Sequence, residues 1–126
     1  MKRLIIDLDD TITLSAADGY ANALPNLPLI ARLAHYRSCG FDIVIHTSRN
    51  MRTYEGNIGK ITAHTLPVIV AWLAQHDVPY DEIYIGKPWC GTDGFYVDDK
   101  AIRPSEFLRY DLEAIHALLA AEKTGA

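Results

Sequence analysis

The strongest constraint on the fold is an alternation of short apolar runs with helical segments along a chain of 126 residues. Short apolar runs are typical of strands buried in a parallel sheet, whereas apolar residues three or four positions apart are typical of helices. Strands are expected at residues 4–8, 41–47, 82–86 and 95–98. Helices are expected at 27–39, in a longer stretch after the polar loop 48–59 that is most regular at 65–76, and at 112–122. This alternation predicts an α/β fold with a mainly parallel sheet, helices on both faces and right-handed crossovers.

Local signals set the ends of the expected helices. Gly40 is expected to end the first helix, because glycine commonly follows the last helical residue. Thr65 can cap the second helix, with Pro67 in its first turn, and Asp111 can cap the last one.

Length and composition place the chain among single-domain proteins. Residues 1–126 suffice for one core, and no linker or repeat divides them. The net charge of −4 argues against nucleic acid or an anionic membrane as the main partner. The apolar run at residues 4–6 is too short for a signal peptide or a membrane span. Cys39 and Cys90 lack the spacing of metal ligands, so they predict free thiols in a reducing cytoplasm.

Every expected strand ends in polar or ionisable residues. These endings are DLDDT at 7–11, TSRN at 47–50, GKP at 86–88 and DDK at 98–100. Ligands of open parallel sheets bind beyond the carboxyl ends of the strands, near a switch point in strand order. The four endings therefore predict one functional site at that edge.

The acidic residues among these endings suit a magnesium ion. Asp7 and Asp9 are two positions apart, so in an extended segment their side chains point to the same side. Two close carboxylates repel each other unless a cation lies between them. Asp98 and Asp99 add two more carboxylates, and such hard oxygen ligands fit Mg²⁺, whereas no His/Cys cluster fits zinc.

The same endings contain the parts of a phosphate-transfer site. A carboxylate can attack phosphorus and form an aspartyl-phosphate, and a second one can move protons to the leaving oxygen and from water. Lys87 and the hydroxyl of Thr47, or of Ser48 in its place, can hold the phosphoryl oxygens.

These residues, in this order, resemble the haloacid dehalogenase (HAD)-type phosphohydrolases. The family's DxDxT motif is similar to residues 7–11, its Thr/Ser motif to Thr47, its lysine motif to Lys87 and its acidic pair to residues 98–99. The resemblance spans residues 4–104. It implies a three-layer Rossmann-like domain and a Mg²⁺-dependent phosphatase that acts through an aspartyl-phosphate.

A closer resemblance is to the small capsule-biosynthesis-phosphatase branch of that family. It rests on RNMRTYEGN at 49–57, GKPWCG at 86–91 and DDKAIRP at 98–104. The resemblance implies a sugar phosphate or a polysaccharide (capsule) precursor as substrate.

By the same resemblance, Asp7 is the nucleophile and Asp9 the acid/base. Asp98 would bind Mg²⁺ directly, together with the Asp7 side chain and the Asp9 backbone carbonyl, and Asp99 would hold a metal-bound water. Asp10 departs from the family, which often has Gly there, but Asp tolerates the backbone angles of a turn.

The chain has no room for the large cap domain that many family members carry. Residues 49–62 are a candidate lid, and the candidate substrate contacts are Arg49, Asn50, Arg52, Lys60 and Trp89. A capless member either accepts a bulky substrate or forms a homo-oligomer in which a neighbouring subunit covers the site.

Other interpretations stay open at this point. Arg49 is equally suited to a substrate contact and to a salt bridge with Asp98 or Asp99. Trp89 and Tyr54 can stack on a sugar or serve as packing anchors. For the whole chain, the alternatives are a phospho-acceptor domain of the receiver type and a non-catalytic phosphosugar-binding subunit.

Overall fold

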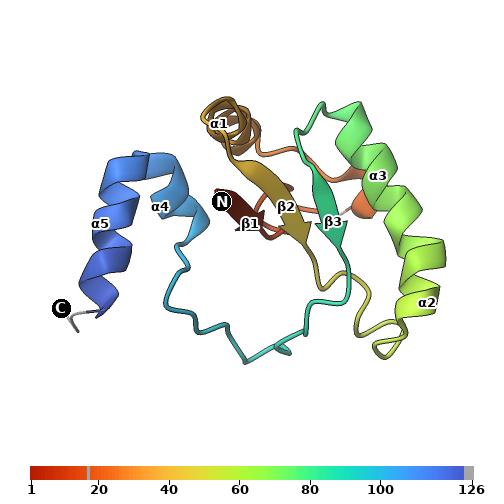
Figure 1. Ribbon diagram of the computed structural model, residues 1–126. Coiled ribbons are helices and arrows are strands. Elements are labelled where there is room, and N and C mark those ends of the chain that lie inside the picture. Colours follow the sequence, from red (N-terminus) through yellow and green to blue (C-terminus); the bar gives the residue numbers. More distant parts are fainter. Residues whose placement is uncertain (17, 124–126) are drawn as a thin grey trace. The chain divides into compact units, whose positions relative to one another are not determined.

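The computed structural model describes residues 1–16 and 18–123, and it has an α/β structure with an open parallel sheet (Figure 1). The described chain divides into two compact units, Met1–Trp89 and Cys90–Ala126. The first unit contains the sheet, and the second contains the last two helices.

The first unit is built on three strands that pair in parallel throughout. Its strands are β1 (Arg3–Ile6), β2 (Asp42–His46) and β3 (Glu82–Tyr84), in that spatial order. The three strands predicted for this part of the chain are therefore confirmed, although each ends earlier than expected. As a result, Asp7 and Thr47 are the first loop residues after their strands.

The register brings the carboxyl ends of the three strands to one edge. Ile6 pairs with Ile45, and His46 pairs with Tyr84. Beyond the strands, the N–H of Thr47 donates to the carbonyl of Tyr84 at 2.9 Å, so the hydrogen bonding continues into the loops. Residues that directly follow the strands meet here, as expected for an open parallel sheet.

Helix α1 (Leu27–Ser38) connects β1 to β2, as the sequence predicted. The side-chain oxygen of Asn26 caps it by accepting from the N–H of Leu29 at 3.4 Å, and Pro28 lies in the first turn, where its missing N–H has no helical partner to lose. Gly40 follows its end with φ +93°, a conformation that side chains rarely allow. The buried face of α1 consists of Leu29, Ile30, Leu33 and Tyr36.

The second crossover is the long helical stretch expected after the polar loop, and it begins at Ile58, just before that loop was expected to end at Gly59. It comprises α2 (Ile58–Lys60), the π-helical η2 (Ile61–Thr65) and α3 (Leu66–Gln75). The wider π-helical turn comes just before Pro67, whose missing N–H and bulky ring disturb regular α-helical hydrogen bonding in the preceding turn. The expected helix from 65 to 76 is confirmed as the second half of this stretch.

The cap of this stretch lies elsewhere than the sequence suggested. Thr65 makes no capping hydrogen bond, and its hydroxyl donates instead to Asn50 Oδ1 at 2.7 Å. Asn57 is the cap, because its side-chain oxygen accepts from the N–H of Lys60 at 3.0 Å. Thr65 has a side chain that is typical of a helix cap, but it lies inside the helical stretch, because the residues before it are already helical.

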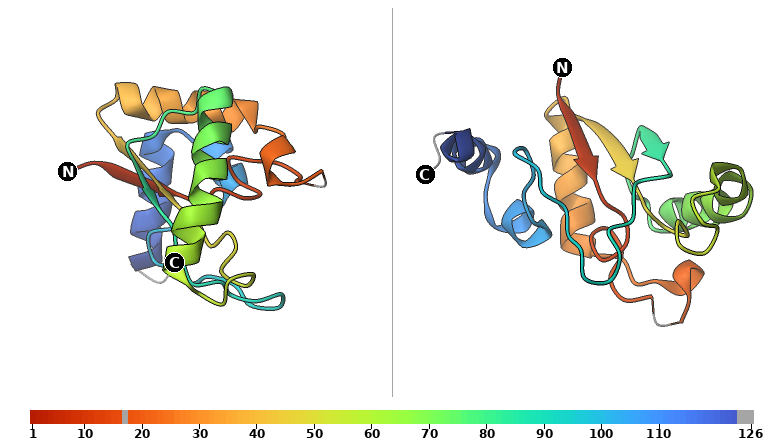
Figure 2. Two further views of the ribbon diagram at one scale, coloured as in Figure 1. Left: turned by 90° about the vertical axis from the view of Figure 1, so that its right-hand side faces the viewer. Right: turned by 90° about the horizontal axis from the view of Figure 1, so that it is seen from below.

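The two crossover helices cover the sheet from one side. The strand order β1–β2–β3 advances in one direction, so right-handed crossovers place α1 and α3 on the same face, and α1 runs behind β1 and β2 in the right-hand view of Figure 2. Helices were predicted on both faces, whereas the crossover helices of this unit share one.

Trp72 of α3 is buried, and its Nε1–H donates to the carbonyl of Ala23 at 2.8 Å. The core around these helices includes Leu29, Leu33, Ile43, Ile45, Ile69 and Leu73.

The second unit corrects one prediction and confirms another. Residues 95–98 do not form the expected strand, and Phe95 and Val97 are 80% and 87% exposed. Alternating apolar residues indicate that a segment suits a strand, but a strand also needs a neighbour to pair with, which the pattern does not specify. Helix α5 (Leu112–Lys123) is capped as predicted, since Asp111 Oδ1 accepts from the N–H of Ala114 at 2.9 Å.

A further helix of this unit, α4 (Pro104–Arg109), was not predicted from the sequence. Glu106 stabilises its start by accepting from the N–H of Arg103 at 2.8 Å, and Pro104 is its first residue. Among the helices of the described residues, none is long and apolar enough to cross a membrane.

Candidate functional site

The loop after β1 is shaped by three hydrogen bonds to one carbonyl. The buried Leu8 accepts from the N–H groups of Thr11, Ile12 and Thr13 at 3.3, 2.9 and 3.0 Å. Asp10 makes the turn possible with φ +61°, in the left-handed region that Asp tolerates better than most residues. The sequence had assigned Asp10 to this turn, and its backbone conformation confirms that assignment.

Asp7 lies between a hydroxyl and a cation. Thr11 Oγ1 donates to Asp7 Oδ2 at 3.2 Å, and Lys87 Nζ lies 3.6 Å from Asp7 Oδ1. Burial is the main influence on this carboxyl and raises the pKa of Asp7, although the charge of Lys87 and the hydrogen bonds oppose that effect. A half-buried carboxylate with a raised pKa beside a lysine is typical of a functional site.

The ends of β2 and β3 are tied together next to Asp7. The N–H of Lys87 donates to the carbonyl of Thr47 at 3.1 Å, so the two predicted phosphate-binding residues are neighbours. Thr47 is buried and its Oγ1 accepts from the N–H of Arg49 at 3.1 Å, whereas Ser48 is only partly buried. The structure thus brings together Asp7, Thr47, Ser48 and Lys87 at one edge, as expected from the strand endings.

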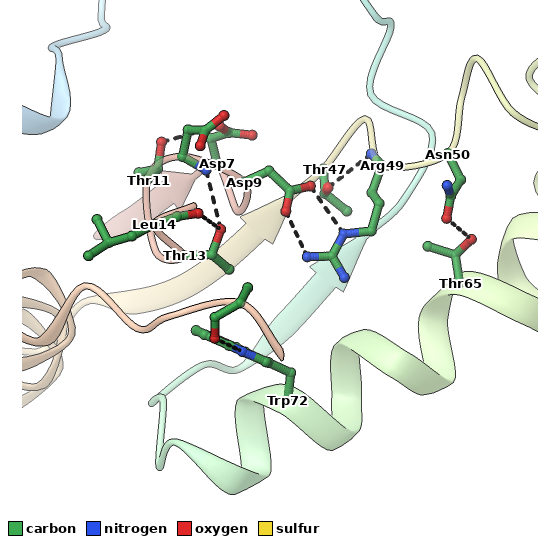
Figure 3. A network of polar contacts seen from close by, with 12 residues as sticks. Asp7, Asp9, Thr11, Thr13, Leu14, Thr47, Arg49, Asn50, Thr65 and Trp72 are labelled. Atoms are coloured by element: carbon green, nitrogen blue, oxygen red, sulfur yellow. Dashed lines mark hydrogen bonds and ion pairs between the residues drawn. The ribbon is translucent and has the colours of Figure 1, made fainter. Parts of the chain in front are cut away.

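Asp9 and Arg49 form a forked ion pair that the sequence did not predict. Arg49 Nε donates to Asp9 Oδ2 at 3.1 Å, and Arg49 Nη2 donates to Asp9 Oδ1 at 2.7 Å (Figure 3). The sequence suggested a salt bridge to Asp98 or Asp99, but the observed partner is Asp9. The alternative, a substrate contact by Arg49, stays a prediction. Spacing along the chain could not reveal a pair that joins two loops forty positions apart.

Tyr20 is a residue of this site that the sequence analysis missed. It begins the short 3₁₀ helix η1 (Tyr20–Asn22), and the guanidinium carbon of Arg49 lies 4.1 Å from its ring centroid. Tyr20 and Asp9 also line a cavity of about 380 Å³, here called the Asp9 pocket. Its other lining residues are Asp10, Thr13, Leu14, Ala16 and Gly19. No motif marks Tyr20, because its role depends on where a loop folds back.

The candidate lid, residues 49–62, is closed on itself by turns and is attached to the helix that follows. Asn50 adopts φ +61°, donates to Thr53 Oγ1 at 3.2 Å and accepts from Thr65. Ile58 lies against Gly86, close to where a Cβ on that glycine would project. These contacts anchor both ends of the segment, and its action as a lid stays a prediction.

The other candidate substrate contacts lie at the surface. Arg52 stacks on the ring of Trp89 with its guanidinium carbon 5.6 Å from the ring centroid, and Trp89 remains 45% exposed. Lys60 is exposed at the end of α2. The Arg52–Trp89 pair offers a flat, partly apolar surface with a cation, a combination suited to sugar rings and phosphates.

The predicted metal ligands are divided between the two units. Asp7 and Asp9 belong to the first, while Asp98 and Asp99 belong to the second, where Asp98 Oδ1 accepts from the N–H of Lys100 at 2.9 Å. Among the residues the structure describes, no group of three or more His, Cys, Asp or Glu side chains is clustered to hold a metal ion. A magnesium site that includes Asp98 and Asp99 stays a prediction.

The chain is similar to a protein of known structure. The protein is of the mixed α/β class with an open, all-parallel sheet. It is similar to a crystal structure of a Vibrio cholerae protein solved as a structural-genomics target, with 60% sequence identity and a TM-score of 0.95 over 97% of this chain and 99% of the other. The chain belongs to the same family as that Vibrio protein. No protein-family model matches the chain, and no curated protein matches it.

Proposed function

We propose that this protein is a Mg²⁺-dependent phosphatase of the haloacid dehalogenase type, which hydrolyses phosphate monoesters through an aspartyl-phosphate at Asp7. The observation that carries the proposal is the meeting of three strand ends, with Asp7 after β1, Thr47 after β2 and Lys87 after β3. Lys87 Nζ lies 3.6 Å from Asp7, where it can hold a phosphoryl oxygen next to the attacking carboxylate. The three-layer HAD-like architecture and the single domain over 1–126 belong to the same proposal.

In the first half of the reaction, an Asp7 carboxylate oxygen attacks phosphorus. A P–O bond to Asp7 forms while the bond to the leaving oxygen breaks, and Asp9 gives its proton to that oxygen. Lys87 and the hydroxyl of Thr47 or Ser48 orient the phosphoryl group, so that the leaving oxygen points away from Asp7.

In the second half, Asp9 takes a proton from water, and the water oxygen attacks phosphorus. The bond to Asp7 breaks, inorganic phosphate leaves, and both carboxyl groups return to their starting states. The two aspartates therefore have different duties although they are only two positions apart.

The carboxyl of Asp7 fits a magnesium ion in one observable respect. Burial raises the pKa of Asp7, and a bound cation would offset that burial by stabilising the carboxylate. Asp7, the backbone carbonyl of Asp9, and Asp98 would hold the ion, with Asp99 on a bound water. Mg²⁺ would supply positive charge to the phosphoryl oxygens during transfer.

The substrate is proposed to be a sugar phosphate or a polysaccharide (capsule) precursor. Support comes from the loop sequences at 49–57 and 86–91 and from the Arg52–Trp89 pair, which offers a stacking surface. Cys39 and Cys90 are free thiols, which agrees with the proposed cytoplasmic location.

The test is a screen of the purified protein with Mg²⁺ against a panel of sugar phosphates, followed by release of inorganic phosphate. Wild type should hydrolyse at least one ester, EDTA should abolish turnover, and Asp7→Asn should be inactive while folded. Full turnover by a folded Asp7→Asn protein would refute the mechanism, and unchanged turnover without metal would remove Mg²⁺ from it. Long-lived phosphorylation of Asp7 without hydrolysis would instead favour a receiver-type domain.

A further inference from the structure

The forked pair between Arg49 and Asp9 is unlike an ordinary surface salt bridge. The Arg49 side chain is 2% exposed, and both oxygens of the Asp9 carboxylate accept from it, at 2.7 and 3.1 Å. A forked guanidinium–carboxylate contact fixes the plane of the carboxylate as well as its distance. The orientation of Asp9 is therefore set by Arg49.

Arg49 is itself held from two further directions. Its guanidinium carbon lies 4.1 Å from the centroid of the Tyr20 ring, and its backbone N–H donates to Thr47 Oγ1 at 3.1 Å. Figure 3 shows Arg49 reaching from the loop after β2 to Asp9 in the loop after β1. The orientation of Asp9 therefore depends, through Arg49, on Tyr20 and Thr47.

Stability alone does not account for this arrangement. Arg49 Nη1 is buried and has no hydrogen-bond partner among the described residues, and an unsatisfied buried donor is unfavourable. A buried ion pair, moreover, is often no more stabilising than well-packed apolar residues would be. A cost of this kind is typical of positions where function fixes the side chain.

The Asp9 carboxylate nevertheless remains accessible. Its side chain is 30% exposed, and it lines the Asp9 pocket together with Tyr20. A leaving group in that pocket would meet a carboxyl group whose direction is already fixed. Proton transfer requires such alignment to within hydrogen-bonding reach.

We propose that Arg49 is a positioning residue, whose guanidinium, stacked on Tyr20, holds the Asp9 carboxylate in the orientation in which it exchanges a proton with the leaving group. This proposal rests on the proposed phosphatase function and adds a residue to it. Arg49 acts through Asp9 and makes no bond to the phosphoryl group. Its loss should therefore slow the step that needs a proton donor and leave phosphoryl binding unchanged.

The test compares two esters with different needs for a proton donor. The leaving oxygen of glycerol 2-phosphate must be protonated as it departs, whereas p-nitrophenolate leaves without a proton. Leaving-group release is measured in a single turnover with enzyme in excess and Mg²⁺ present, so only the first step is seen. The variants are Arg49→Gln, Arg49→Lys and Tyr20→Ala.

We expect Arg49→Gln to slow release from glycerol 2-phosphate by at least about 100-fold and release from p-nitrophenyl phosphate by less than about tenfold. Arg49→Lys should show the same preference, because an ammonium group cannot replace the fork. Tyr20→Ala should show it to a smaller degree. The matched control is Arg37→Gln, which removes another Arg–Asp pair, to Asp81 at 2.7 Å, beside the opposite end of β2 and should change neither rate.

Each other result has a defined meaning. Equal losses on both esters, or wild-type rates in Arg49→Lys, would overturn the positioning role. A raised KM with unchanged kcat would also overturn it, by making Arg49 a substrate contact. If Arg49→Gln does not fold by circular dichroism, the comparison of Arg49→Lys with Tyr20→Ala decides in the same way. A wild type that hydrolyses neither these esters nor any ester of the sugar-phosphate panel would overturn the proposed function, whereas an active wild type with unselective variants would overturn this inference alone.

Discussion

Replacing Asp7 by Asn should inactivate the protein and at the same time stabilise it. Burial raises the pKa of Asp7 from its ordinary 3.8, because the buried carboxylate is less well solvated than in the unfolded chain. A raised pKa in the folded state means that the contribution of this group to stability is fully present below pH 3.8 and is lost as the pH rises through the raised value. At pH 7 the ionised Asp7 therefore destabilises the fold.

The size of the effect follows from the surroundings of Asp7. Asn keeps an oxygen for the hydroxyl of Thr11, loses the attraction of Lys87 at 3.6 Å, and no longer places a charge in the site. Burial outweighs Lys87 in the pKa of Asp7, but the side chain is 37% exposed, so solvent screens both effects. We expect a net gain of about 0.5 kcal/mol in the free energy of unfolding at pH 7, and no more than about 1 kcal/mol.

The assay is urea unfolding of wild type and Asp7→Asn in EDTA, at pH 7 and again below pH 3.8. The gain should be present at pH 7 and should vanish at the lower pH, where the native Asp7 is neutral too. Effects of other carboxyl groups are common to both proteins and cancel in the difference. Asp77→Asn is the matched control, an exposed carboxylate with φ +52° that should change neither stability nor activity.

Activity should respond in the opposite direction. Loss of the proposed nucleophile should lower phosphate release by at least about 10⁴-fold. A loss of stability at pH 7 in Asp7→Asn would show that the attraction of Lys87 exceeds the effect of burial, and would refute the reasoning given for this carboxyl.

Three further predictions concern the surroundings of the site. Burial and nearby positive charge lower the pKa of His46, so the stability of wild type should fall as the pH drops below 6.5. In Tm measurements, His46→Asn should reduce that fall. An equal fall of Tm in both proteins would contradict the prediction. Trp72→Phe leaves the carbonyl of Ala23 without its donor and should cost about 1–3 kcal/mol in urea unfolding, whereas no change would mean that the bond adds nothing. Gly86 has φ +84°, and an added Cβ would lie 2.6 Å from the Cδ1 of Ile58, so Gly86→Ala should lower stability by about 1–2 kcal/mol and also lower kcat. Removing the clash with Ile58→Ala should not restore stability, because the backbone strain remains; full recovery would assign the cost to the clash alone.

The ends of the first three strands show what a sequence pattern can predict. Asp7, Thr47 and Lys87 were placed together because parallel strands deliver their carboxyl ends to one edge, and the hydrogen bond from Lys87 to Thr47 and the 3.6 Å contact with Asp7 agree with that rule. Helix α1 and the cap of α5 were predicted for a similar reason, since capping and apolar spacing depend on neighbours along the chain.

Other predictions of secondary structure differ from the observed structure. Residues 95–98 have the composition of a strand but do not pair as one, because pairing depends on a distant segment. The second crossover helix was expected after the polar loop that ends at Gly59, and it begins only slightly earlier, at Ile58, because Asn57 caps it. The conformation of a segment could be predicted where it depends on neighbouring residues. It could not be predicted where a strand needs a distant segment to pair with.

The sequence by itself determined the class of fold, the three paired strands and the residues that follow them, because side-chain periodicity and turn chemistry act over a few positions. Only the tertiary structure decided that Arg49 grips Asp9, that Tyr20 stacks on Arg49, and that these residues border a pocket. An ion pair between two loops forms where the sheet register brings them together, and charge alone gives each arginine several equally suitable carboxylates. Packing selects one of those carboxylates, and packing depends on segments that are far apart in the sequence.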